Sequence, residues 1–502
     1  MPSSSQNTPF SHRIAKAGTL TVAGKLVCRG FDLIVIAVLS RVLTPADFGL
    51  TALAMISVTI AETVMSLPLG AALLRVPEPT KPMYDTAFTL AFLRGALLAL
   101  ALGTMGFVMM AIYNEPRLVA LVAALSIAPI MRGLLSPLMI KYTRAMNYWP
   151  STWIEIAGKG VALVVACAVA FLTHSYWAIA AATITTPFVM NILSYWIAPY
   201  RPRFCLAEWK MFKGDVGWNS LTQLIGTLNW QMDRLLLGYF VPKADLGRYT
   251  MASDLANIPV QAVVVPLGSP VLVAYSARGA KEQGELAQTY LKTSSAMLAL
   301  AGPVFILLAL LAVPAVRLVL GPNWLEAGAL LQWIALFTFL SLPAINLNQL
   351  ALALDEARMI TWRTVMSFCV AMPALFLGSL YYGVAGVIVA RFVTVLFTMG
   401  VSMEAVRRLI GCSVMEQLLS LLRPVLALSA MGATLWLLRP LVVMEAVLPL
   451  FFTLAAVASV GLLVYVTVLF LLWQKESRPA GIETVVWEKG KGFVMWATGW
   501  LK

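Results

Sequence analysis

Charged side chains lie inside long apolar stretches of this chain, where a charge is costly. In the first such stretch, Lys25, Cys28, Arg29 and Asp32 follow an i, i+3, i+4, i+7 spacing, which places them on one stripe of a helix. Arg suits a phosphate or pyrophosphate, because its planar guanidinium donates two parallel hydrogen bonds to phosphate oxygens. The stripe therefore predicts a site that binds an anion.

The composition indicates that the apolar stretches cross a membrane. The chain is 60% hydrophobic and 12% charged, whereas a soluble domain is roughly 45–50% apolar and about 25% charged. About fourteen segments have the length and apolarity of a membrane span. They lie near 19–39, 49–73, 84–112, 117–140, 151–173, 176–198, 216–240, 247–275, 287–318, 324–350, 358–381, 383–403, 422–442 and 447–473. We therefore expect an all-α, polytopic membrane protein with about 14 transmembrane helices.

The charges inside these segments divide by expected role. Each would cost about 2.5–3.5 kcal/mol at the bilayer centre, so most must face the bundle interior or water. We expect the following cations to line a substrate-binding cavity: Lys25, Arg29, Arg94, Arg132, Arg234, Arg363 and Arg391. Four acids would tune this cavity or couple it to a bound ion: Asp32, Glu62, Asp233 and Asp254. The alternative is a set of buried ion pairs that only hold helices together, and the i,i+4 spacing of Glu155 and Lys159 predicts such a structural pair.

A short phrase occurs twice in the same setting. TPADFG at 44–49 and PKADLG at 242–247 each follow an apolar run, 198 positions apart. The same shift places Pro68-Leu69-Gly70 on Pro266-Leu267-Gly268. The shift covers an even number of spans, so the two halves point the same way and form a parallel repeat about an axis along the membrane normal. The Asp after each Pro is expected to cap its helix.

The repeat predicts the domain organisation. We expect a six-helix lobe at 1–200, a cytoplasmic linker at 201–215, a second six-helix lobe at 216–408, two additional transmembrane helices at 409–473 and a cytoplasmic tail at 474–502. Lys and Arg gather in the loops and tails on the side of the N-terminus, including Arg201, Arg203 and Lys475. Both termini are therefore expected to be cytoplasmic.

Several classes of function are disfavoured by the sequence. The formal net charge of +13 has no soluble basic domain to carry it, so no nucleic acid is expected as a partner. A P-loop is missing, as are G-x-S-x-G and HExxH motifs, and the outer loops are too short for a glycan polymerase or ligase. The five cysteines and two histidines lack metal-site spacing. We expect no metal, no cofactor and no enzyme activity.

Residues 18–75 resemble a known family. Their turn Arg41-Val42-Leu43-Thr44-Pro45-Ala46-Asp47-Phe48-Gly49, between two apolar helices, is similar to the Arg-Leu/Val-Leu-x-Pro-x-Asp-Phe-Gly turn of polysaccharide-transporter flippases. This family belongs to the multidrug/oligosaccharidyl-lipid/polysaccharide exporter superfamily. The segment 233–252 is similar to the family as well.

The resemblance implies a function. Such flippases carry a polyprenyl-pyrophosphate-linked oligosaccharide across the bacterial inner membrane by alternating access, coupled to an ion gradient of H⁺ or Na⁺. It implies partners in a polysaccharide polymerase and export machinery, in exopolysaccharide, capsule or O-antigen biosynthesis. A lipid II flippase or an amphiphilic-drug exporter of the same superfamily stays open as an alternative, as does a membrane enzyme that polymerises or ligates glycans.

Overall fold

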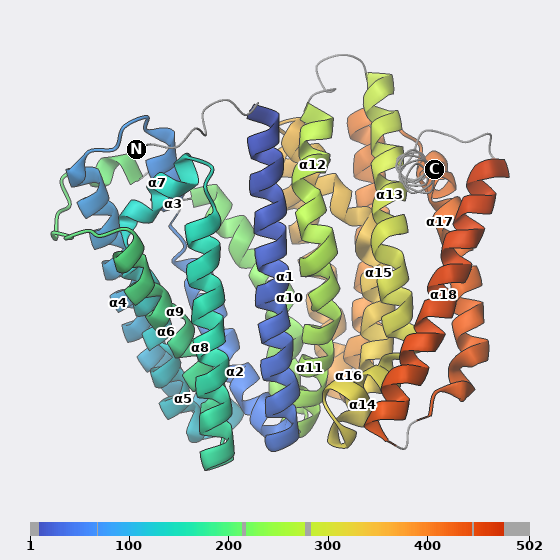
Figure 1. Ribbon diagram of the computed structural model, residues 1–502, viewed down its shortest axis with the longest axis horizontal. Coiled ribbons are helices and arrows are strands. Elements are labelled where there is room, and N and C mark those ends of the chain that lie inside the picture. Colours follow the sequence, from blue (N-terminus) through green and yellow to red (C-terminus); the bar gives the residue numbers. More distant parts are fainter. Residues whose placement is uncertain (1–9, 68, 213–216, 277–282, 444–445, 476–502) are drawn as a thin grey trace, which may run out of the picture. The chain divides into compact units, whose positions relative to one another are not determined.

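The computed structural model describes residues 10–67, 69–212, 217–276, 283–443 and 446–475, and these residues form helices joined by short connections (Figure 1). The predicted cytoplasmic tail lies almost wholly outside the described residues. The described part contains no strand. The all-α class expected from the composition is therefore confirmed.

The chain divides into two compact units. Unit 1 comprises residues up to Thr250 together with Leu375–Val387. Within it, α8 packs against both α1 and α9, α4 packs against α5 and α6, and α10 packs against α2. The elements of unit 1 are α1 (Phe10–Val42), α2 (Pro45–Val64), α3 (Leu69–Arg75), α4 (Lys81–Tyr113), α5 (Arg117–Leu125), α6 (Ile127–Gly133), η1 (Pro137–Met139), α7 (Ile140–Arg144), α8 (Trp149–Thr173), α9 (Trp177–Ile197), η2 (Trp209–Phe212), α10 (Gly217–Phe240) and the first part of α11 (Lys243–Pro259).

Unit 2 holds the rest of the described chain. Its core gathers around Phe305, Leu428 and Met431, where α13 packs on α15 and α17. Its elements are the end of α11, a π-helical turn η3 (Val260–Val264), α12 (Val265–Ser276), α13 (Gln283–Leu310), α14 (Ala312–Val319), η4 (Pro322–Trp324), α15 (Leu325–Ala353), most of α16 (Ala357–Ile410), α17 (Val414–Leu438), η5 (Arg439–Leu441) and α18 (Val447–Lys475).

The helices confirm a multi-pass membrane protein. Among the described residues, 10 helices are long and apolar enough to cross a membrane, or up to 11 if the bent pair Arg117–Gly133 and Pro137–Arg144 is one span. The long α16 turns back at Gly383, whose φ of 56° lies in the left-handed region, and so contains the two predicted spans 358–381 and 383–403. Helices α1 and α10 match predicted spans but carry too many polar groups to be among the ten. The number of about fourteen spans stays a prediction, as do the predicted lobes.

The first copy of the repeated phrase begins helix α2 as the sequence predicts. Thr44 is the N-cap and Pro45 is the first helical residue, a position where Pro loses no hydrogen bond. The Asp47 carboxylate accepts from the Thr44 backbone N–H at 3.0 Å, while Thr44 Oγ1 accepts from the Asp47 N–H. This reciprocal capping box confirms the role expected of Asp47. Asp245, at the equivalent position of α11, forms an ion pair with Arg248 at 2.7 Å.

The two copies of the phrase meet in space. A methyl group at Gly49 would lie 1.9 Å from the carbonyl oxygen of Lys243, and one at Gly247 would lie 1.8 Å from the carbonyl oxygen of Pro45. The shift that relates the repeats converts Gly49 into Gly247 and Pro45 into Lys243, so each glycine touches the counterpart of the other's contact. We call this contact the glycine junction. Such a reciprocal contact is what a two-fold relation between repeats produces.

We expect Gly49→Ala to destabilise the protein, because no side chain can replace hydrogen where two backbones approach this closely. Overpacking of this kind typically costs about 1–3 kcal/mol in the free energy of unfolding. Gly103→Ala is the matched control, because a methyl group there meets nothing within 4 Å. Thermal unfolding of the two purified variants in detergent would measure the difference. Equal stability of the two variants would contradict the glycine junction.

Candidate anion-binding site

The charged stripe of α1 forms one side of a cluster between α1 and α8, which run side by side (Figure 1). Arg29 Nη1 donates to Asp32 Oδ2 at 3.2 Å, and Lys159 Nζ of α8 donates to the other oxygen of the same carboxylate. Lys25 lies about one turn before Arg29 and is exposed. We call these residues the Asp32 cluster. Two cations, Arg29 and Lys159, pair with this one carboxylate, and the exposed Lys25 adds a positive charge on the same stripe, so the cations of the cluster outnumber its acid.

The expected structural pair of Glu155 and Lys159 is corrected by this arrangement. The described residues hold no ion pair between them, and Lys159 instead pairs with Asp32. An i,i+4 pair along a helix stabilises by only about 0.2–0.5 kcal/mol. A carboxylate from a neighbouring helix that also satisfies Arg29 is the stronger partner, because hydrogen bonds to charged groups are worth about 1.5–3 kcal/mol. Glu155 is half-buried one turn away.

A second cluster joins three helices of unit 1. Arg132, in the last turn of α6, donates from Nε at 3.0 Å and from Nη2 at 2.5 Å to Glu62 Oε1 of α2. Arg94 of α4 donates to the Glu62 backbone carbonyl at 3.2 Å. The Arg94 Nε atom is buried and has no hydrogen-bond partner among the described residues. We call these three residues the Glu62 cluster, and here too the cations outnumber the acid.

Both clusters lie deep along their helices and are open to solvent. At about 1.5 Å per residue, Arg29 lies about 20 Å from the end of α1, and Arg94 lies about 20 Å from the start of α4. The side chains of Arg29 and Arg132 are 42% and 45% exposed. Charges at such depth cannot face lipid without a cost of several kcal/mol, so the exposed sides must meet water or an anion.

Asp233 and Arg234 are neighbours on α10, and the Asp233 carboxylate makes hydrogen bonds that hold the local structure. Asp233 is buried, and it accepts a hydrogen bond from the Tyr249 hydroxyl of α11 at 2.5 Å and from the Arg234 backbone N–H at 2.9 Å. The bond from Tyr249 joins α11 to α10 across their turn. The Arg234 side chain is half-buried.

The remaining predicted residues belong to unit 2. Arg363 of α16 donates to the Ala344 carbonyl of α15 at 3.1 Å. Arg391, also on α16, and Asp254 of α11 are half-buried. The role of each predicted site residue stays a prediction.

The structure brings together one ion cluster that the sequence did not reveal. Glu115, in the loop between α4 and α5, is buried and accepts from Arg117 Nε at 2.7 Å and Nη2 at 3.1 Å. Lys243, at the start of α11, donates to Glu115 Oε2. Lys243 also supplies the carbonyl of the glycine junction, so this Glu115 cluster secures the same end of unit 1. No spacing in the sequence could relate residues so far apart in the chain.

A family profile fits the features described above. The profile of a family described as polysaccharide biosynthesis protein matches residues 38–329, which is more than half of the chain. The chain belongs to this family. The match begins at the end of α1 and runs through both copies of the repeated phrase.

Two relatives have known names. The chain is 23% identical over 282 residues to the teichuronic acid biosynthesis protein TuaB of Bacillus subtilis, covering 55% of this chain and 58% of that protein. It is 23% identical over 331 residues to the succinoglycan biosynthesis transport protein ExoT of Rhizobium meliloti, covering 63% of this chain and 64% of that protein. The chain thus matches about three fifths of the length of each.

Solved structures share the fold. The lipid II flippase MurJ in an inward closed conformation superposes with a TM-score of 0.70 at 13% identity, over 92% of this chain and 100% of that chain. An inward-facing multidrug resistance MATE family transporter of the MOP superfamily gives 0.58 at 13% identity, over 76% of this chain and 94% of that one. These findings confirm the resemblance to polysaccharide transporters of this superfamily. None of the four names is that of an enzyme, in agreement with the expectation from the sequence.

We expect the Glu115 cluster to make stability depend on pH. The hydrogen bond from Arg117, and then the bond and charge of Lys243, outweigh burial and lower the pKa of Glu115 from its usual 4.5 to about 2. A carboxyl whose pKa is depressed by folding stabilises the protein fully above about pH 4.5, and that stabilisation is lost as the pH falls toward 2. Glu115→Gln should therefore lower the free energy of unfolding by about 1–3 kcal/mol at pH 7 and by less at pH 3.

Unfolding temperatures of the parent protein and Glu115→Gln, followed from pH 7 to pH 3, would measure this effect. Glu78→Gln is the control, because Glu78 is an exposed carboxyl outside this cluster. A gap between parent and Glu115→Gln that stays constant across the pH range would contradict the predicted role of Glu115.

Proposed function

We propose that this protein is a flippase that moves a polyprenyl-pyrophosphate-linked oligosaccharide repeat unit across the cytoplasmic membrane during exopolysaccharide, capsule or O-antigen biosynthesis. The observation that carries the proposal is the excess of half-exposed cations at membrane depth in the Asp32 and Glu62 clusters. The names of the relatives and the fold shared with a lipid II flippase support it.

The two clusters suit reversible binding of an anion. Arg29 is held by Asp32 at 3.2 Å, a long contact that leaves the outer side of the guanidinium accessible. A pyrophosphate group could take the place of that contact while Lys159 keeps Asp32 neutralised. In this scheme the carboxylates position the cations between transport cycles, and protonation or Na⁺ binding at Asp32 or Glu62 couples the cycle to an ion gradient.

Alternating access would place the proposed site in contact with one side of the membrane at a time. Near the glycine junction, the Glu115 cluster and the bond from Tyr113 Oη to the Leu235 carbonyl at 3.1 Å join turns of both repeats. We propose that this end faces outward and that the contacts there close the path to the outside. Both termini would then be cytoplasmic, and a polymerase and the export machinery would receive the product.

The charge of the site argues against the alternative of an amphiphilic-drug exporter, for which we expect an acid-dominated cavity. A cavity selects its ligand by opposite charge, and an acid-dominated site would be needed for a cation. In the Asp32 and Glu62 clusters the cations outnumber the acids.

We expect Arg29→Ala and Arg132→Ala each to weaken transport strongly while protein levels stay normal. Loss of one bidentate, charge-assisted contact of about 1.5–3 kcal/mol should lower substrate affinity roughly 10–100-fold. Surface polysaccharide, measured beside the amount of protein in the membrane, provides the first test. Arg439→Gln is the control, because Arg439 is exposed on η5.

A second measurement separates binding from folding. Arg29→Lys keeps the positive charge but lacks the planar guanidinium. Its transport rate should therefore fall between that of the parent protein and that of Arg29→Ala. Transport of a lipid-linked oligosaccharide by the purified protein in proteoliposomes would rank the three. Normal transport by Arg29→Ala and Arg132→Ala would exclude a role for these residues in substrate binding.

A further inference from the structure

The segment that follows α9 is held tightly against α4. In this strap, residues 199–212, the Tyr200 hydroxyl donates to Asp85 Oδ1 at 2.7 Å and the Arg203 backbone N–H donates to the same oxygen at 2.9 Å. The Cys205 N–H donates to Thr89 Oγ1 at 3.0 Å, and the Glu208 N–H donates to Thr86 Oγ1 at 3.4 Å.

The polar residues of α4 therefore serve as hydrogen-bond acceptors for the strap. Asp85, Thr86 and Thr89 are all buried, although they lie on a membrane-spanning helix. Burial and the neighbouring Asp85 carboxyl raise the pKa of Tyr200, so its hydroxyl stays a neutral donor. At the far end of the strap, Phe212 is buried with Leu73 and Tyr84. The strap is an ordered part of unit 1.

The outward side of the strap combines cations with large apolar side chains. Arg201, Arg203 and Lys210 are exposed, and Glu208 is its single acid. Phe204 is 71% exposed although its ring lies tilted beside those of Phe88 and Phe92, and Leu206 and Trp209 are exposed as well. Exposed apolar side chains beside cations at the end of a membrane span are typical of the membrane interface.

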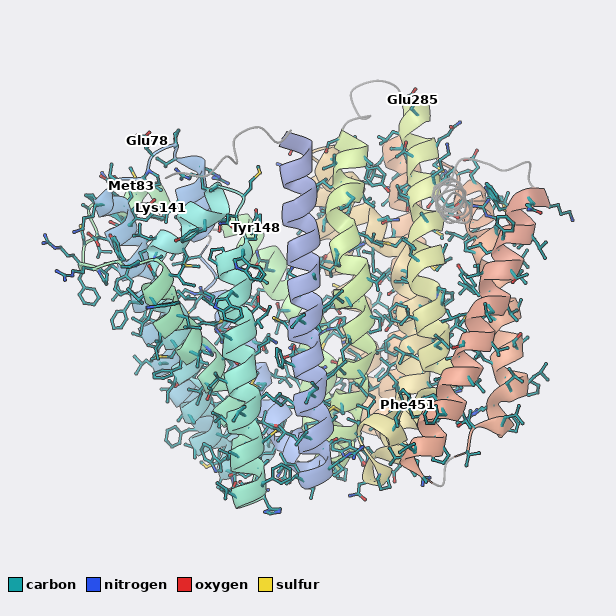
Figure 2. The ribbon with its side chains drawn as sticks, viewed as in Figure 1. Glu78, Met83, Lys141, Tyr148, Glu285 and Phe451 are labelled. Carbon is teal, nitrogen blue, oxygen red and sulfur yellow. The ribbon has the colours of Figure 1, made fainter. Side chains whose placement is uncertain are left out.

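The level of the strap along α4 fits the boundary of a bilayer. Helix α4 has 33 residues, so it is about 50 Å long and exceeds a hydrocarbon core of about 30 Å. Phe88 lies about 10 Å from the start of α4, at the expected edge of the core, and Phe92 lies about one turn further in, while Lys81 lies at the start. Figure 2 shows Met83 at one end of unit 1 together with Glu78, Lys141 and Tyr148.

We propose that the strap is a binding site for acidic phospholipids. Arg201, Arg203 and Lys210 contact the headgroup phosphates, and Phe204 and Leu206 enter the adjacent acyl layer. Aromatic side chains beside basic ones at the end of a span favour a position at the membrane interface. Each basic residue near an anionic surface raises the affinity about fivefold, which corresponds to about 1 kcal/mol. The strap is distinct from the proposed transport site and does not depend on which substrate is carried.

The test is a lipid titration of the full-length protein in detergent, with bound lipids counted by native mass spectrometry. The parent should bind dioleoylphosphatidylglycerol in preference to dioleoylphosphatidylcholine. The triple variant Arg201→Gln, Arg203→Gln, Lys210→Gln should lose about 100-fold in apparent affinity for the strap lipid, whereas Arg201→Lys with Arg203→Lys should keep it. The matched control Arg407→Gln, Arg408→Gln, Arg439→Gln makes the same change of charge on exposed residues outside the strap.

Two further measurements distinguish binding of an intact lipid from binding of a soluble phosphate compound. Soluble glycerophosphoglycerol should compete poorly, because it offers no acyl chain to Phe204 and Leu206, and Phe204→Ser should weaken lipid binding with the cations intact. Unfolding temperatures establish that each variant is folded. Equal lipid loss in the strap and control triple variants, or equal competition by the soluble headgroup, would overturn the proposal.

Discussion

The cost of a charge in the membrane is the constraint on which the rest of this structure depends. Asp32 lies between Arg29 and Lys159, and Glu62 receives Arg132 while its backbone receives Arg94. The Asp32 carboxylate serves two cations and the Glu62 carboxylate serves one, and in both clusters the cations outnumber the acid. Water or a bound anion must neutralise that excess, because lipid cannot. In the function proposed above, the anionic headgroup of the substrate would supply the missing charge for part of each cycle.

The two copies of the repeated phrase meet backbone to backbone. At the glycine junction, the helices that follow the two copies of the phrase approach so closely that a methyl group on either side would overlap a carbonyl oxygen. The neighbouring Glu115 cluster adds a buried carboxylate shared by Arg117 and Lys243. A close backbone contact and ionic hydrogen bonds thus hold the same end of unit 1.

Irregular backbone near a membrane needs partners, and the strap shows how this chain supplies them. Its N–H groups cannot bond to lipid, so Asp85, Thr86 and Thr89 of α4 accept them instead. These three polar residues would be unfavourable on a lipid-facing helix. Their burial under the strap explains them, while Phe204 and the basic side chains of the strap stay exposed.

The sequence by itself determined the helical class, the membrane setting, the family and the duplicated phrase. These properties follow from local composition and from similarity along the chain, which need no knowledge of distant contacts. It also identified Arg29, Asp32, Arg132 and Glu62 as charges that required an explanation. The capping role of Asp47 was predictable because a cap is made within one turn of chain.

Only the tertiary structure decided which charges are partners. Lys159 was expected to pair with Glu155 but pairs with Asp32, because α1 packs against α8 and offers a carboxylate that two cations can share. Asp233 became a buried acceptor for Tyr249, and Glu115 met Lys243 far along the chain. Such pairings depend on which helices are neighbours, and the spacing of residues in one helix carries no information about the helix opposite.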